Sequence, residues 1–374
     1  MARKAKKSTT QPSALPFEQS IEDVRSRLVE LEELAKQTTH DLSEELEFYR
    51  ERLKRLTHEV YSDLTAWNRV QVASHPNRPL TGDYIEHLCD DFVELHGDGT
   101  FGDDRAIVTG LGTIRGHQVM VIGHRKGRTT KERLACHFGS AHPEGYRKAL
   151  LKMQLAERMG LPIVCFVNTP GAYPGVGAEE RGQARAIAEN IYKMFQVRVP
   201  IIALLIGDGG SGGALGIAVA DCVAMLENSW YSVISPEGCA SILWRSAEGK
   251  EKAADALKLT AESMHGLGLV DEVVSEPVGG AHAHSKQAMD MVGDFISQEL
   301  DRLGQIQVDD LLANRYQKFR QIARTEAKIQ KQAAAEAQQE QQAAPDPSAV
   351  VPGEPDASGP VRRTPGSPRS RRRS

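Results

Sequence analysis

Cysteine is scarce in this sequence. Its 374 residues include five cysteines, which lie far apart and form no Cys-x-x-Cys pair. An odd and scattered set predicts no disulfide framework, is typical of a reducing compartment, and argues against a zinc site built by this chain alone. Cys165 and Cys222 lie within apolar runs, where we expect small buried thiols.

Long apolar runs are missing as well. No stretch of about 18 apolar residues occurs, which excludes a membrane-spanning helix. The basic segment from Met1 to Ser8 has no apolar stretch behind it, so it does not predict a secretory signal. With 46 basic and 50 acidic residues the formal net charge is −4, so no general attraction to nucleic acid or to a membrane follows. The sequence therefore predicts a cytoplasmic protein.

The residues that are present divide the chain into five segments. We expect a disordered N-terminus over residues 1–16, a helical hairpin over 17–75, one compact domain over 76–285, C-terminal helices over 286–343, and a disordered basic tail over 344–374. Apolar residues of the hairpin recur every three or four positions, which indicates two antiparallel helices serving as a brace or docking arm. The arginine-rich end of the tail can contact nucleic acid or an acidic surface, and a solubilising role explains it equally well.

Strands and helices alternate in the central domain. A helix over Pro143–Met159 is expected to end at Gly160, since glycine commonly follows the last helical residue. The other predicted helices cover 179–195 and 213–220, and the predicted strands cover 107–111, 119–122, 163–167, 201–206, 222–226, 232–235 and 269–274. This alternation predicts an α/β core of repeated β–β–α units. Beyond residue 285 two helices are expected, the second with Leu312, Tyr316 and Phe319 along one apolar stripe.

Two glycine-rich loops, over 168–177 and 207–214, each follow a predicted strand and precede a helical segment. Glycine lets a ligand approach the backbone closely, and a helix N-terminus adds unpaired N–H groups and the positive end of the helix dipole. Such a site receives an anion or a developing oxyanion. We expect Gly212, Gly213 and Ala214 to supply the donors, with Gly171 and Ala172 facing them. Tight helix–sheet packing is the alternative, and two loops after successive strands favour a site.

Other chemistries find less support. Gly207–Gly212 contains a formal G-x-G-x-x-G, but it falls late in the domain, and no Gly-Lys-Ser/Thr of a P-loop follows. Ser211 and Ser235 are interpreted as lacking the strand–turn–helix context of a nucleophile. His282 and His284 are too few to predict a metal site. Lys126 and Arg128 could meet a phosphate, although a solvated loop explains them about as well. The missing acid–base residue suggests that the proton acceptor belongs to the substrate or a cofactor.

Several long motifs in one order resemble the carboxyltransferase alpha subunits of bacterial-type acetyl-CoA carboxylases. The resemblance covers about residues 17–282, and Asp208 stands where many relatives have glutamate. The tail beyond residue 344 has no counterpart in the family core. The motifs that carry the resemblance are NTPGAYPGVGAEERGQ from Asn168, GDGGSGGALGI from Gly207, YSVISPEGCASILW from Tyr231 and PVGGAH from Pro277.

The resemblance implies a crotonase-like fold and a separate beta subunit, usually the zinc-bearing one, in an α2β2 assembly. It implies transfer of a carboxyl group from carboxybiotin on a biotin carboxyl carrier protein to acetyl-CoA, giving malonyl-CoA for fatty acid synthesis. Gly213 and Ala214 would then be the donor pair, Gly171, Ala172, Tyr173 and Gly210 would form the biotin pocket, and released biotin would act as the base. ATP would be used by the biotin carboxylase component, since this chain has no ATP motif.

Two alternatives remain open. The first is a stand-alone crotonase-like hydratase or hydrolase acting on an acyl-CoA, which predicts turnover by this chain alone. The second is a non-catalytic assembly subunit whose hairpin and tail recruit partners and whose glycine loops only pack.

Overall fold

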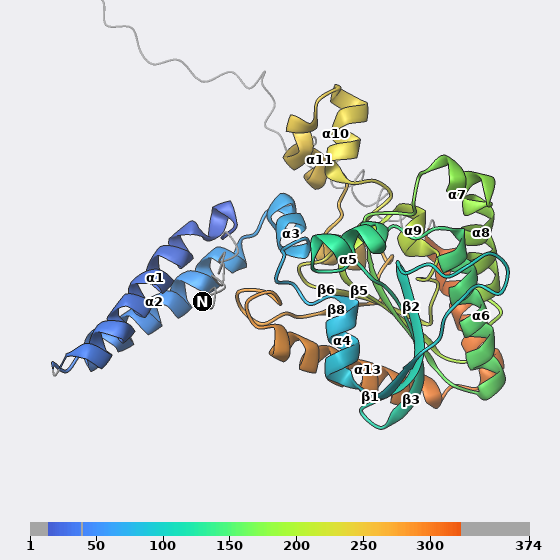
Figure 1. Cartoon of the computed structure of the whole chain (residues 1–374), viewed down its shortest axis with the longest axis horizontal. Coiled ribbons are helices and arrows are strands. Elements are labelled where there is room, and N and C mark those ends of the chain that lie inside the picture. Colours follow the sequence, from blue (N-terminus) through green and yellow to red (C-terminus); the bar gives the residue numbers. More distant parts are fainter. Residues whose placement is uncertain (1–13, 39, 323–374) are drawn as a thin grey trace, which may run out of the picture. The chain divides into compact units, whose positions relative to one another are not determined.

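The computed structural model describes residues 14–38 and 40–322. The predicted tail over 344–374 and the end of the predicted C-terminal helices lie outside the described residues. A mixed eight-stranded sheet organises the described part (Figure 1). The strands are β1 (Cys89–Glu94), β2 (Ile107–Ile114), β3 (His117–His124), β4 (Ile163–Thr169), β5 (Ile201–Gly210), β6 (Cys222–Leu226), β7 (Trp230–Ser232) and β8 (Glu272–Val274).

The order across the sheet is β1-β2-β3-β4-β5-β6-β8. The pairs β1–β2 and β2–β3 are antiparallel, and the pairs from β3 onward are parallel. The last strand in this order, β8, lies beside β6. The short strand β7 pairs with the end of β5, so that Asp208 lies opposite Trp230 and Gly210 opposite Ser232. The end of β5 is therefore held by a strand that comes 20 residues later in the chain.

Both faces of the sheet are covered by helices. Along β4, Ile163, Cys165 and Val167 belong to one apolar cluster, whereas Val164 and Phe166 belong to the other, because successive side chains of a strand point to opposite faces. Figure 1 shows α6 (Pro143–Met159) and α8 (Gln183–Met194) on one side and α4 (Thr81–Leu88) and α13 (Ser285–Gly304) on the other. The sheet with helices on both faces is the α/β architecture that the alternation of strands and helices predicts.

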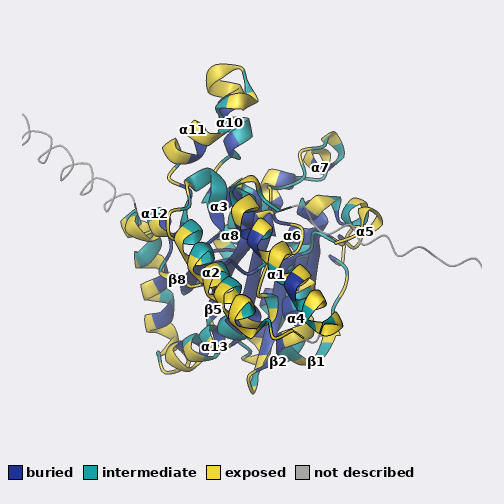
Figure 2. Cartoon of the chain, turned by 90° about the vertical axis from the view of Figure 1, so that its left-hand side faces the viewer, coloured by how far each residue is buried: buried dark blue, intermediate teal, exposed yellow. Residues whose placement is uncertain are grey.

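The N-terminal helical hairpin is confirmed. It consists of α1 (Gln19–Gln37) and α2 (Ser43–Ser62), which lie side by side and expose most of their outer surface (Figure 2). The two helices of the hairpin were expected to fill residues 17–75, so that the second would end near residue 75. It stops earlier, because Thr65 caps a new helix, α3 (Ala66–Ala73), and its Oγ1 accepts a hydrogen bond from the Asn68 amide at 3.1 Å.

Most predicted strands differ by a few residues from their expected bounds, and the elements that flank the glycine loops differ as follows. The helix expected over 179–195 is divided into α7 (Val176–Glu180) and α8, because Gly182 adopts a left-handed φ of 82°. The strand expected over 201–206 continues to Gly210, and the helix expected over 213–220 is only α9 (Ser211–Leu215). The remaining elements are η1 (Pro16–Glu18), α5 (Thr130–Ala135), η2 (His137–Gly139), α10 (Pro236–Trp244), η3 (Ala247–Gly249), α11 (Lys250–Ala256) and α12 (Ala261–Gly266).

The buried face of the last described helix, over 308–322, differs from the apolar stripe that was expected. Leu311 and Arg315 are buried there, whereas Tyr316 is 51% exposed. The Arg315 guanidinium donates to both Asp221 carboxylate oxygens and to the carbonyls of Met194, Val197 and Val199. A charged side chain is tolerated inside because each of these bonds replaces one to water. In the part of the chain that the structure describes, no helix is long and apolar enough to cross a membrane.

Candidate functional site

The two glycine loops are in direct backbone contact. A Cβ atom added to Gly210 would lie 2.1 Å from the Pro170 carbonyl oxygen, and one added to Gly213 would lie 2.4 Å from the Ala172 amide nitrogen. No side chain larger than hydrogen fits at either position unless the first loop moves. The structure thus brings together Gly171, Ala172, Gly210 and Gly213 from the two predicted loops.

The second loop ends where α9 begins. Ala214 is fully buried, and Gly212, which precedes Gly213, is partly exposed. The first amides of a helix have no intrahelical acceptor, so the start of α9 directs N–H groups toward the contact with the first loop. Gly171, with a φ of 145°, adopts a backbone conformation that other residues rarely reach.

The expectation that Ser211 lacks a strand–turn–helix context is wrong. Because β5 runs through the glycines to Gly210, Ser211 directly follows a strand and begins α9, with a strained φ of 52°. Such a turn resembles a nucleophile elbow. Within the described residues, however, no histidine ring hydrogen-bonds to Ser211. The positive φ of Ser211 therefore lies at the junction of β5 and α9.

A buried carboxylate lies below the second loop. Asp208 Oδ1 accepts hydrogen bonds from Ser74 Oγ at 2.9 Å and from Trp230 Nε1 at 2.8 Å, and Oδ2 is paired with the Lys126 ammonium. Burial opposes ionisation, but the Lys126 charge and these hydrogen bonds hold the pKa of Asp208 below its usual range. Asp208 is therefore ionised, and it ties the segments that follow α3 and β3, together with β7, to the loop.

Asn168 connects the two loops. Its side-chain Oδ1 accepts a hydrogen bond from the backbone amide of Asp208 at 3.1 Å. The backbone amide of Asn168 donates to His124 Nδ1 at 3.4 Å. His124 is buried beside the Gly213 backbone, and burial lowers its pKa to about 3. It is thus neutral, and among the described residues its Nε2 has no hydrogen-bond partner. The Gly213 carbonyl accepts the Tyr146 hydroxyl at 3.2 Å, so both side chains contribute to the surroundings of Gly213.

Lys126 and Arg128, the predicted phosphate contacts, both have acidic partners. The Lys126 side chain is only 18% exposed because it is paired with Asp208. Arg128 is 45% exposed, pairs with Asp83, and donates to the Pro76 carbonyl at 3.2 Å. Both line a pocket of about 880 Å³ together with Arg105 and Arg125. Of the two predicted contacts, Arg128 is the more accessible to an anion.

Tyr173 lies on the first loop and stacks on His142, with ring centroids 4.1 Å apart. Its amide donates to the Ala141 carbonyl at 3.0 Å. The Tyr173 carbonyl and that of Ala141 both accept the buried Gln183 side-chain amide. These bonds anchor the first loop to the start of α6 and to α8.

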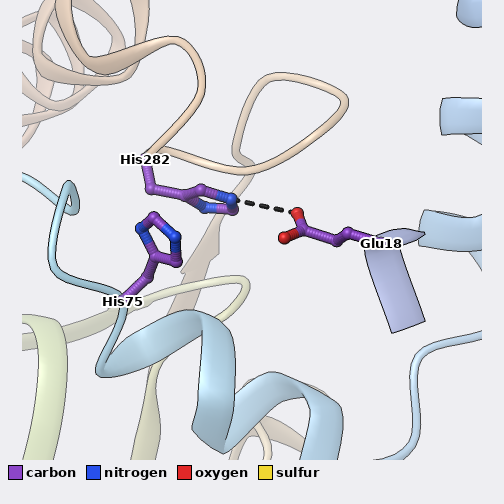
Figure 3. Close-up of side chains that lie close together, drawn as sticks. All are labelled: Glu18, His75 and His282. Carbon is purple, nitrogen blue, oxygen red and sulfur yellow. Dashed lines mark hydrogen bonds and ion pairs between the residues drawn. The ribbon is translucent and has the colours of Figure 1, made fainter. Parts of the chain in front are cut away.

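His282 joins a different group from the one considered in the sequence. Figure 3 shows it between Glu18 and His75, and its Nε2 lies 3.1 Å from Glu18 Oε1. Glu18 also accepts the Tyr61 hydroxyl at 2.5 Å, and the Asn77 amide donates to His75 Nδ1 at 3.1 Å. The His282–Glu18 hydrogen bond attaches the hairpin to the sheet domain. His284, in contrast, is not part of this group.

Comparison with known proteins identifies the family to which this chain is similar. Residues 14–323 match the family described as acetyl co-enzyme A carboxylase carboxyltransferase-like. The chain is 52% identical over 312 residues to the acetyl-coenzyme A carboxylase carboxyl transferase subunit alpha of Rhodopirellula baltica, covering 82% of this chain and 96% of that protein. It is 51% identical over 308 residues to the Thermus thermophilus subunit of the same name, covering 82% of this chain and 98% of that protein.

Two solved structures are similar at a lower level. One is a Pseudomonas malonate decarboxylase hetero-tetramer in complex with coenzyme A, with 19% identity, a TM-score of 0.48, and coverage of 64% of this chain and 93% of that one. The other is transcarboxylase 12S, with 22% identity, a TM-score of 0.45, and coverage of 56% of this chain and 40% of that one.

Proposed function

Because the chain belongs to the acetyl co-enzyme A carboxylase carboxyltransferase-like family, we propose that it helps transfer a carboxyl group from carboxybiotin, held on a biotin carboxyl carrier protein, to acetyl-CoA. The product is malonyl-CoA, which enters fatty acid synthesis. The chain acts as the alpha half beside a beta subunit in an α2β2 assembly. The five free thiols support a cytoplasmic setting, and ATP is consumed by the separate biotin carboxylase.

The backbone contact between the two glycine loops is the observation that carries this proposal. Negative charge develops on the ureido oxygen of biotin as the carboxyl group leaves. Amides of Gly213 and Ala214, near the start of α9, are suited to stabilise that charge, and one such donor is typically worth about 2.7–4 kcal/mol. Gly212, the third predicted donor, lies one residue closer than Gly213 to the start of α9. Gly171, Ala172, Tyr173 and Gly210 would form the biotin pocket beside these donors.

The acyl-CoA would approach from the side of the pocket of about 880 Å³ that Lys126 and Arg128 line. Arg128 is the more exposed of the two cations, and a guanidinium matches a phosphate group well. A phosphate contact by Arg128 would require exchange of its Asp83 partner. Lys126 would instead act mainly through Asp208, by keeping the second loop in position.

An exposed apolar surface supports the need for a partner. Val233, Ile242 and Leu243 are 75%, 72% and 62% exposed, and Trp244 is 40% exposed. We name these four residues, on and just before α10, the α10 patch. Figure 2 shows exposed residues on this helix. Grouped apolar side chains on a surface are typical of protein–protein interfaces.

The test measures malonyl-CoA formation from acetyl-CoA and carboxylated biotin carrier, with the chain alone and with a purified beta subunit. We expect activity only in the mixture. Turnover of acyl-CoA by the chain alone would favour the stand-alone hydratase or hydrolase. A stable complex without carboxyl transfer would favour the assembly subunit.

A further inference from the structure

Three side chains that ligate metals meet beside the first glycine loop. Asp104 precedes β2, His137 begins η2, and His142 is the residue immediately before α6. One ligand atom from each lies within 4.8 Å of the others. The three residues line a pocket of about 360 Å³, which the Arg181–Glu144 ion pair also borders.

The ligand atoms of this group are available. Within residues 14–38 and 40–322, the ring nitrogens of His137 and His142 have no hydrogen-bond partner. The two rings are in edge contact, with centroids 4.3 Å apart. In the group of Glu18, His75 and His282 (Figure 3), ring nitrogens are already used in hydrogen bonds. His282 Nε2 is bonded to Glu18, and the Nδ1 lone pair of His75 accepts the Asn77 backbone amide. A neutral imidazole that accepts at Nδ1 carries its proton on Nε2 and offers no second lone pair.

The carboxylate is oriented as a metal ligand would be. Asp104 is 5% exposed, and its Oδ1 and Oδ2 accept the amides of Ala106 at 2.9 Å and His142 at 2.7 Å. The nearby Lys148 ammonium instead binds Asp103 and the Asp104 carbonyl. Among the described residues the Asp104 carboxylate therefore has no cation within ion-pair distance. A buried carboxylate without a cation is costly, and ligating carboxylates are commonly held by such outer hydrogen bonds.

The backbone that presents His137 is strained. His137 and Phe138 have φ values of 48° and 56°, followed by Gly139 at 88°. Non-glycine residues rarely adopt positive φ, and such strain is found at ligand sites. This turn directs the His137 ring toward His142, which in turn stacks on Tyr173.

We propose that Asp104, His137 and His142 bind one divalent transition metal ion of the Zn²⁺ type, with a remaining coordination position open to the pocket. Two imidazoles and one carboxylate suit Zn²⁺ and its neighbours in the first transition row, and an open position is typical of three-ligand sites. The ion would join the turn before α6 to the segment before β2. Through the His142–Tyr173 stack it would also steady the first glycine loop. The sequence predicted no metal site in this chain, since these ligands lie 33 and 5 residues apart and match no metal-binding spacing.

The test titrates the metal-free full-length chain with Zn²⁺ by calorimetry and with Co²⁺ by visible absorption. We expect one equivalent to bind. His137→Asn keeps a residue that tolerates positive φ, and His142→Phe keeps a ring on Tyr173. Each should weaken Zn²⁺ binding at least about tenfold, as loss of even an outer-shell partner can. His40→Ala, in the exposed turn of the hairpin, should bind as the parent chain does.

Thermal melting completes the test. Zn²⁺ should raise the unfolding temperature of the parent chain and of His40→Ala, but not that of the two site variants at the same concentration. No bound equivalent in the parent chain would overturn the proposal. So would unchanged affinity in both site variants, or a loss of binding in His282→Phe rather than in them.

Discussion

At the residue scale, the glycines of the second loop differ sharply in the room around them. Gly213 has the Ala172 amide where a Cβ would be, at 2.4 Å, whereas the nearest atom to a Cβ on Gly212 is Ile187 Cγ2 at 3.8 Å. The first distance is far inside van der Waals contact and the second is ordinary contact. Adjacent positions in one sequence motif therefore serve different purposes. Gly213 is required for close approach of the two loops, and steric room does not restrict Gly212 in this way.

This difference predicts the outcome of a matched pair of substitutions. Gly213→Ala should lower carboxyl transfer with the beta subunit by about 100-fold or more, because displacing one oxyanion donor typically costs that much. Gly212→Ala should lose much less. The measurement is the initial rate of malonyl-CoA formation, with complex formation checked by gel filtration. Equal losses in the two variants would contradict this account of the loop contact.

Buried His124 predicts a pH dependence of stability. Its pKa falls from an ordinary 6.5 to about 3 in the folded chain, so between these values the unfolded chain binds a proton that the folded chain does not. Stability contributed by this group is present above pH 6.5 and is lost on acidification. Its contribution to the unfolding free energy should fall by about 2 kcal/mol between pH 6.5 and 5.

The measurement for His124 is denaturant unfolding of the parent chain and of His124→Gln at both pH values. Other groups, including His75, whose burial lowers its pKa to about 4, change equally in both proteins. The gap between the two unfolding free energies should therefore narrow at pH 5. A gap that stays constant would show that His124 does not titrate in this range.

Sequence reasoning at this scale identified glycines but not their partners. The spacing of Gly171, Gly210 and Gly213 after strands was enough to indicate two loops that meet. The partners of Lys126 and Arg315 are Asp208 and Asp221, which lie 82 and 94 residues away in the chain. Nothing in local composition connects such residues. Their pairing follows from how distant strands and helices pack in three dimensions.

At the element scale, one buried ion pair joins the segment after α3 to the segment after β8. Arg78 donates to both Glu276 carboxylate oxygens, at 3.0 and 2.5 Å, and to the Ile206 carbonyl at 2.8 Å. Both side chains are almost completely buried. Burial opposes the charge on Glu276, but the Arg78 charge and hydrogen bonds lower its pKa to about 2. The pair is therefore ionised throughout the physiological range.

Breaking this pair should be costly. Arg78→Ala should lower the unfolding free energy by about 3–5 kcal/mol, because it leaves Glu276 buried without its counter-ion. Arg78→Met combined with Glu276→Leu should be much milder, since no unpaired charge remains. Denaturant unfolding at neutral pH measures both. A single variant no less stable than the double variant would contradict the expected desolvation cost.

Whether the end of a helix or strand could be predicted depends on whether nearby residues or a distant strand determine it. The helix Pro143–Met159 agrees with its prediction at both ends, since Pro143 and the left-handed Gly160 bound it locally. The extension of β5 to Gly210 was missed because it depends on pairing with β7, and a glycine-rich run has no strand propensity of its own. Local signals fixed the ends of α6, whereas a distant strand fixed the end of β5.

At the scale of the whole molecule, two exposed apolar surfaces compete as the docking site for a partner. One is the α10 patch, and the other lies on the hairpin, where Val29, Leu34 and Phe48 are 53%, 50% and 59% exposed. The hairpin residues are spread over two helices in which charged side chains dominate the exposed face. The α10 patch instead has three exposed apolar residues in a row, Ile242, Leu243 and Trp244, with no charged residue among them. Exposed apolar side chains without charged neighbours are the better indicator of an interface.

The α10 patch should therefore contribute most of the affinity for the beta subunit. Ile242→Lys combined with Leu243→Lys should weaken the complex by at least about 30-fold, which corresponds to one interface hot spot of about 2 kcal/mol. Phe48→Lys on the hairpin is the control, because it places a lysine on a similarly exposed apolar residue of the other surface. Sedimentation with purified beta subunit measures both affinities, and thermal melting of each variant alone verifies folding. If Phe48→Lys weakens the complex and the α10 variant does not, the hairpin is the docking arm and α10 serves another contact.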